Sequence, residues 1–123
     1  EKYYRCAKLL LNIHSAPEDF DQFTGMPLEI IAEKNPYHLK PTEQIPVRIL
    51  YKGKPLPDAQ TIKISKNSGI RAFGPRTDKD GRALLNLKEN GPWLISVVHL
   101  IATPKHEDTH WVSYWASLTL SRQ

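Results

Sequence analysis

The residues best able to do chemistry lie in one short segment near the C-terminal end of the chain. His106 and His110 flank Glu107 and Asp108, so two imidazoles and two carboxylates occur close together. Imidazole and carboxylate groups together bind zinc, nickel, cobalt or copper. In an extended strand the two histidines would lie roughly 13 Å apart and could not share an ion, whereas a turn or helical loop would bring them together. The competing interpretation is a solvated polar loop between two strands.

A third histidine, His99, stands within an apolar segment, whereas His14 and His38 lie in segments of loop character. A single imidazole in a covered strand is usually a hydrogen-bonded core residue. We expect this role for His99 unless it contributes to the metal site described above.

The aromatic residues near the end of the chain could serve binding rather than chemistry. Trp93, Trp111, Tyr114 and Trp115 are candidates for a platform that holds a sugar or a peptide. Aromatic residues in strands more often pack in the core or against neighbouring strands. Solvent exposure separates the two interpretations, because a platform requires Trp111 and Trp115 on a solvent-facing surface.

No pattern in the sequence indicates an enzyme. The chain has no G-x-S-x-G nucleophile elbow, and its lone cysteine, Cys6, lies in an apolar stretch. No motif brings a nucleophile and a base together. We therefore predict a non-enzymatic protein without catalytic residues.

Length and charge limit the classes of protein to which the chain can belong. At 123 residues and 40% apolar composition, it fits one domain with a single core. The net charge of +4 is spread along the chain without a basic run, so nucleic acid is not an expected partner. The longest apolar stretches, such as Trp93–Ala102, fall well short of the roughly 20 residues of a transmembrane helix, so no transmembrane segment is expected. A single cysteine allows no internal disulfide and leaves the cellular compartment open.

Turn residues divide the chain into an N-terminal segment and a body. Residues 1–25 are predicted to be a strand or a helix followed by a linker, with the end of an upstream domain as one interpretation. Residues 26–123 are predicted to form one β-sandwich domain.

The body is organised around Ile45–Ser65, which we predict to be a β-hairpin with two strands joined by a turn rich in glycine and proline. Leu28, Ile30 and Ala32 alternate in an earlier strand. Trp93–Thr103 is apolar at successive positions, which predicts a central strand covered on both faces. Trp111–Leu120 alternates between apolar and polar positions. Short strands with frequent turns predict an all-β, antiparallel β-sandwich of immunoglobulin-like or prealbumin-like type with about seven strands.

Several short motifs, taken together and in order, resemble those of a known family. They are Ala7-Lys8, Gly25-Met-Pro-Leu-Glu-Ile-Ile31, Asn35-Pro-Tyr37, Leu39-Lys-Pro41, Ile45-Pro-Val47, Gly53-Lys-Pro-Leu56, Ala59, Thr77-Asp-x-x-Gly81, Gly91-Pro-Trp-Leu94, Val98-His99 and Ser113-Tyr-Trp-Ala-Ser-Leu118. The family is a domain of unknown function found in uncharacterised periplasmic proteins, described as the periplasmic component of cobalt or nickel transport systems. The resemblance covers nearly the whole chain.

The resemblance implies a secreted, periplasmic protein of a Gram-negative cell with a sandwich similar to Cna-B and transthyretin-like domains. It also implies binding or uptake of nickel or cobalt, with a membrane transporter or an upstream domain as partner. His99 is the one histidine that matches the family pattern. We therefore expect a weak, open nickel or cobalt site formed by His106 and His110 with Asp108 or Glu107, and with His99 as a contributor. The alternative is a structural or adhesive module that binds a protein or glycan without metal.

Overall fold

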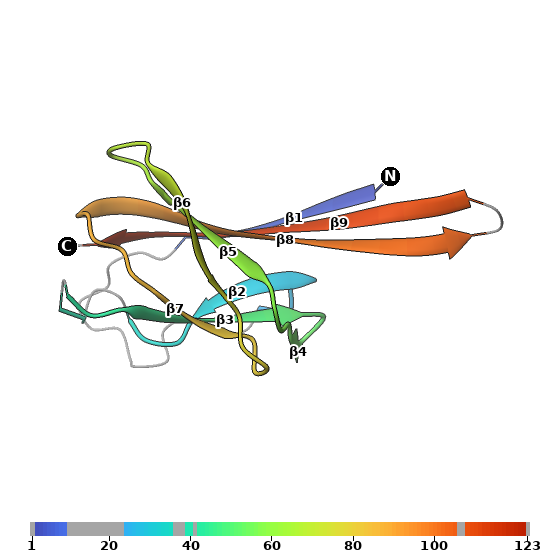
Figure 1. The fold of residues 1–123 in the computed structure, drawn as a ribbon, viewed down its shortest axis with the longest axis horizontal. Coiled ribbons are helices and arrows are strands. Elements are labelled where there is room, and N and C mark those ends of the chain that lie inside the picture. The colour runs from blue at the N-terminus through green and yellow to red at the C-terminus, as the bar shows by residue number, and fades with distance from the viewer. Residues whose placement is uncertain (1, 10–23, 36–38, 41, 106–107, 123) are drawn as a thin grey trace.

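The chain folds into two β-sheets that pack face to face (Figure 1). The structure is a computed structural model, and it describes residues 2–9, 24–35, 39–40, 42–105 and 108–122. The larger sheet has the strand order β1 (Lys2–Leu9), β9 (Asp108–Arg122), β8 (Gly91–Lys105), β5 (Gln60–Ser65) and β6 (Arg71–Arg76). The smaller sheet contains β2 (Leu28–Ala32), β3 (Ile45–Tyr51), β4 (Lys54–Pro55) and β7 (Arg82–Leu85), the last two both paired with β3.

The predicted all-β sandwich is confirmed. The part of the chain that the structure describes contains nine strands and no helix, and so no helix able to cross a membrane. The sequence predicted about seven strands. One additional strand is the two-residue β4, which is too short to leave an alternating pattern.

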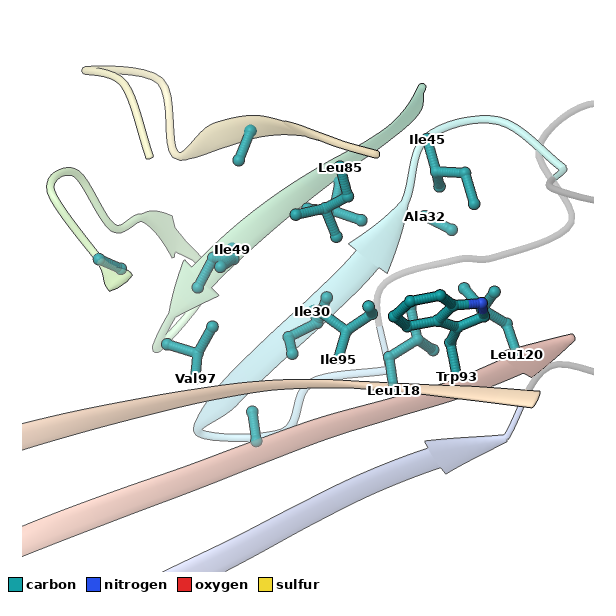
Figure 2. Packing of buried hydrophobic residues seen from close by; sticks show 14 of the residues in the cluster. Ile30, Ala32, Ile45, Ile49, Leu85, Trp93, Ile95, Val97, Leu118 and Leu120 are labelled. Carbon is teal, nitrogen blue, oxygen red and sulfur yellow. The ribbon is translucent and has the colours of Figure 1, made fainter. Parts of the chain in front are cut away.

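Strand alternation places the core between the two sheets. Every second residue of β2 and of β3 is buried, as the sequence predicted for Leu28, Ile30 and Ala32. The larger sheet contributes Trp93, Ile95, Val97, Ala116, Leu118 and Leu120 to the same cluster. Figure 2 shows Ile30, Ile95 and Leu118 lying between the ribbons of the two sheets. Burial of these apolar side chains is therefore what holds the layers together.

The long pair formed by β8 and β9 is the centre of the larger sheet. Their register runs without interruption from Gly91 opposite Arg122 to Lys105 opposite Asp108. In Figure 1 the far end of this hairpin extends beyond the smaller sheet. The predicted central position of Trp93–Thr103 is confirmed, but the predicted cover on both faces is wrong. Only the face toward the smaller sheet is buried, because the described residues place no third layer on the other side.

The predicted hairpin over Ile45–Ser65 is also wrong. Its two strands form as predicted, but β3 lies in the smaller sheet and β5 lies in the larger one. After β3 the chain makes a tight turn into β4, and Asp58 then adopts a φ of 56° before β5 begins. Pro55 and Pro57 fix φ and donate no backbone hydrogen bond, so the connector does not continue a ladder. It crosses from one sheet to the other.

β1 forms the edge of the larger sheet. It pairs in parallel with β9, from Lys2 opposite Val112 to Leu9 opposite Thr119. Of the two interpretations of the N-terminal segment, the strand is therefore correct for Lys2–Leu9. Most of the predicted linker lies outside the described residues, and the division of the chain at residue 25 stays a prediction.

A buried ion pair connects β1 to the smaller sheet. The Lys8 Nζ donates a hydrogen bond to Glu29 Oε2 on β2 at 3.0 Å, and Glu29 is 1% exposed. The Thr24 amide and hydroxyl and the Gly25 amide also donate to this carboxylate. Burial opposes ionisation of Glu29, but the hydrogen bonds from Thr24 and Lys8 outweigh it, and the pKa of Glu29 lies below its ordinary value of 4.5. The ionised carboxylate thus fixes β1 and the entry to β2 at once.

We expect Glu29→Gln to lower the free energy of unfolding at neutral pH by roughly 2 kcal/mol, because a neutral amide accepts fewer hydrogen bonds and removes the ionic attraction between Glu29 and Lys8. The pKa of Glu29 is lower in the folded state, so its contribution is present above the unfolded pKa and is lost as pH falls through the folded pKa. The difference between wild type and variant should therefore shrink in acid. Urea unfolding at several pH values measures it.

The matched control is Glu33→Gln, which removes a carboxylate paired with Arg82 at 2.9 Å on the surface. A solvent-exposed ion pair contributes little to stability, so the free energy of unfolding of this variant should stay close to that of wild type at every pH. An equal loss in both variants, or a Glu29→Gln effect that does not change with pH, would contradict the role given to the buried carboxylate.

Candidate functional site

The outer face of the larger sheet carries an exposed apolar surface, which we call the outer platform. Its members are the large hydrophobic side chains that alternate away from the core. They are Tyr3 and Leu9 on β1, Trp111 and Trp115 on β9, Val98 and Leu100 on β8, and Phe73 on β6, and each is 38% to 76% exposed. Contiguous apolar surface of this kind is uncommon on a monomeric protein and marks a place of contact.

The strand register brings these side chains side by side. Val98 of β8 lies opposite Trp115 of β9, which in turn lies opposite Arg5 of β1. Leu100 and Tyr3 flank Ser113 in the next outward row. Neighbouring strands are about 4.8 Å apart, so the side chains within each of these two rows lie next to one another across β8, β9 and β1.

Two of the four predicted platform aromatics lie on this surface. Trp111 is 45% and Trp115 is 42% exposed, whereas Trp93 and Tyr114 are buried in the core. The Trp115 indole Nε1 donates a hydrogen bond to Ser113 Oγ at 3.2 Å, which directs the ring along the strand. The exposure criterion stated from the sequence therefore favours a binding platform, built from Trp111 and Trp115 without the other two.

The outer platform is cationic as well as apolar. The Arg5 guanidinium lies 5.7 Å from the ring centroid of Tyr3 and 5.8 Å from that of Trp115, within cation–π range of both. At the other edge of the sheet, Arg71 borders a hollow of about 310 Å³ lined also by Ile62, Ala72 and Phe73. Among the described residues on this face there is no carboxylate to balance the two arginines. Sequence reasoning missed Arg5 and Arg71, because their place on one face depends on non-local pairing.

The structure separates the predicted metal ligands. Asp108 and His110 lie in β9, opposite Lys105 and Thr103, at the far end of the β8–β9 hairpin. His106 lies outside the described residues. His99 pairs with Tyr114, which is four residues along β9 from His110, or roughly 13 Å of strand. The backbone thus keeps Asp108 and His110 close in one strand and does not bring His99 to them.

No group of three or more His, Cys, Asp or Glu side chains in the described ranges could hold a metal ion. His99 instead packs edge-on against the ring of Tyr51 at a centroid distance of 4.6 Å. Burial lowers the pKa of His99, which keeps its imidazole neutral. The metal assignment of His106, Asp108, His110 and His99 stays a prediction.

A cluster of tyrosines lies next to His99 and was not predicted. Tyr4 of β1 stacks on Tyr114 of β9 with ring centroids 5.1 Å apart, and Tyr51 of β3 meets Tyr114 edge-on at the same distance. A hydrogen bond to Tyr51, together with burial, raises the pKa of Tyr114 to about 12. No local pattern links these residues, because they meet only through the β1–β9 register and the packing of the two sheets.

Comparison with protein families gives a match over residues 1–101, to the family described as Domain of unknown function (DUF4198). The chain belongs to this family. Comparisons with curated proteins and with solved structures found no match. Membership of DUF4198 confirms the resemblance to an uncharacterised domain family. The matched range includes His99 and ends before β9, which carries Trp111, Trp115 and His110.

The exposure of the outer platform predicts how the tryptophans respond to a soluble quencher. Iodide should quench Trp111 and Trp115 and leave Trp93, which is 5% exposed, largely unaffected. Trp93→Phe should therefore raise the quenchable fraction of the fluorescence, and Trp111→Phe/Trp115→Phe should nearly abolish it. Stern–Volmer titration of the three proteins measures these fractions. Strong quenching of the double variant would show that the two exposed indoles are not the ones on this face.

Proposed function

We propose that this member of DUF4198 is a non-enzymatic binding module that docks a protein partner on the outer platform. The observation that carries the proposal is the exposure of Trp111 and Trp115 within a continuous apolar sheet face. Trp, Tyr and Arg are the side chains that most often dominate the energy of protein interfaces. Tyr3, Arg5 and Trp115 supply all three types, with Arg5 within cation–π range of both rings.

The side chains of the outer platform favour a protein over a glycan. A sugar presents hydroxyls that need hydrogen-bonding groups around the aromatic ring. The polar residues between the two exposed tryptophans amount to the short Ser113, which is buried and already bonded to Trp115. Leu9, Val98 and Leu100 add aliphatic surface that a protein can cover and a hydroxyl-rich sugar cannot.

Charge identifies the chemistry of the partner more closely. Arg5 and Arg71 lie at opposite edges of the face, and no carboxylate among the described residues accompanies them. A second copy of the chain would therefore bring like charges together. A partner with an apolar centre and acidic residues at its rim matches the face in both respects.

The dimensions of the face indicate a modest affinity. Five strands about 4.8 Å apart and some eight residues of β8 at about 3.3 Å each give a projected area of roughly 500 Å². Buried area of this order on each partner is typical of small, transient complexes. The module would then bind and release its partner rather than form a permanent assembly.

Site-specific photocross-linking tests this proposal. A photoreactive amino acid at position 115 should capture an acidic protein from cells that make the chain, whereas the same group at position 84 should not. Leu84 is 54% exposed on β7 in the smaller sheet. Its exposed fraction is similar to that of Trp115, but it does not lie on the outer platform.

The captured protein is then purified and titrated against variants. Trp115→Ala should weaken binding by about tenfold or more, and Arg5→Ala should reduce the salt dependence of binding. Equal capture at both positions, or a complex that Trp115→Ala leaves unchanged, would contradict the proposal. Capture of a glycan instead of a protein would also contradict it.

A second proposal is that the chain binds nickel or cobalt in the periplasm and passes it to a membrane transporter or an upstream domain. The resemblance given above supports this role, together with the placement of Asp108 and His110 two positions apart in β9 and within four residues of His106 in sequence. Two imidazoles and a carboxylate leave coordination positions open, which suits an ion that is transferred. His99 would act from a separate position.

Calorimetric titration with nickel, cobalt, copper and zinc tests the second proposal. Nickel or cobalt should give heat with wild type and with His99→Ala, and none with His106→Ala/His110→Ala. Binding should weaken as pH falls through roughly 6.5, because a protonated imidazole has no lone pair for the metal. Absence of heat with every metal, or equal heat from wild type and the double variant, would remove this proposal.

A further inference from the structure

A pocket of about 490 Å³ opens on the other side of the larger sheet, where β8 and β9 extend beyond the smaller sheet. Its walls are Tyr4 and Tyr114 from the larger sheet, Gly25 and Pro27 before β2, and Lys52 and Gly53 in the turn after β3. A volume of this size is typical of a pocket for one small molecule. The pocket shares no residue with the outer platform and lies on the opposite face of β1 and β9.

The wall of the pocket is aromatic and held from several sides. Tyr4 is 44% exposed and stacks on the buried Tyr114 with an angle of 12° between the rings. Tyr51 packs edge-on against Tyr114, and His99 packs edge-on against Tyr51. The exposed tyrosine ring thus rests on a fixed base and is available to stack with a flat ligand.

Lys52 is held over this wall by its backbone. It adopts a φ of 50° and Gly53 a φ of 80°, which are the two positive values that the two-residue turn between β3 and β4 needs. The Lys52 amide donates to the Pro27 carbonyl at 2.7 Å and so extends the pairing of β2 with β3. The Lys52 Nζ lies 5.4 Å from the centre of the Tyr51 ring.

The charge inside the pocket is positive. Lys52 forms no ion pair with any carboxylate among the described residues. The charge of the nearby Glu29 is balanced by Lys8, and its oxygens accept hydrogen bonds from the Thr24 and Gly25 amides. A cationic ligand, which tyrosine rings would otherwise attract, is disfavoured because Lys52 already occupies the face of Tyr51. An anionic group on the ligand would meet the free ammonium.

We infer that this pocket binds a small ring compound that carries a carboxylate, with the ring on Tyr4 and the carboxylate on Lys52. An acidic sugar and an aromatic acid share this chemistry. Charge-assisted hydrogen bonding to Lys52 gives affinity for the acid, and stacking gives selectivity for the ring. The inference does not depend on the outer platform or on metal binding.

NMR titration of the ¹⁵N-labelled chain tests the inference with two ring acids, D-glucuronate and benzoate. The neutral analogue of D-glucuronate is D-glucose, and that of benzoate is benzyl alcohol. Acetate serves as an acid without a ring. At least one ring acid should shift the amide signals of Gly25, Lys52 and Gly53. Which of the two binds shows whether the ligand is an acidic sugar or an aromatic acid. Its neutral analogue and acetate should bind about tenfold more weakly, since each lacks one of the two interactions.

Lys52→Asn should lower the affinity for the ring acid about tenfold, since asparagine tolerates a positive φ while removing the charge. Lys54→Asn, the same change at an exposed lysine of β4 outside the pocket, should have no effect. Tyr4→Leu should weaken the binding of the ring acid and leave the binding of acetate unchanged. Binding of acetate as tightly as the ring acid that binds, equal effects of the two lysine variants, or no shift with either ring acid would overturn the inference.

Discussion

The uninterrupted pairing of β8 with β9 is the constraint on which the rest of the structure depends. Because these strands occupy the centre of the larger sheet, every residue in the part that packs on the smaller sheet belongs either to the core or to the outer face. Leu118 and Ile95 are fully buried on one side, and Val98 and Trp115 are exposed on the other. The core and the outer platform are thus two consequences of one register. A shift by one residue would exchange them.

The strands on either side of this central pair supply the remaining residues of the two proposed binding surfaces. On one edge, β1 brings Arg5 to the outer platform and Tyr4 to the pocket, and Lys8 secures the strand to Glu29. A single strand with alternating side chains therefore serves both faces. The buried Lys8–Glu29 pair supports both proposed surfaces because it fixes β1, even though neither residue lines the outer platform.

Local patterns predicted much of the fold because alternation is a local property. The two faces of Trp111–Leu120 could be predicted from the alternation of apolar and polar residues in the sequence. The sequence did not predict which strands and side chains far apart in the chain would meet. The failed hairpin over Ile45–Ser65, the Lys8–Glu29 pair and the tyrosine cluster all depend on which sheet each strand joins, and sequence spacing does not encode that choice. Exposure of the apolar outer positions of β8 was misread for the same reason.

We propose that the outer face of the larger sheet is open in the isolated chain and is the surface that a protein partner covers. Hydroxyl-radical footprinting with mass spectrometry measures this exposure directly. We expect oxidation of Tyr3, Phe73, Trp111 and Trp115 in the isolated chain, and protection of these residues once the purified partner is bound, with Leu84 equally oxidised in both states. Protection of Trp111 and Trp115 in the isolated chain, or partner-induced protection at Leu84 instead, would contradict it.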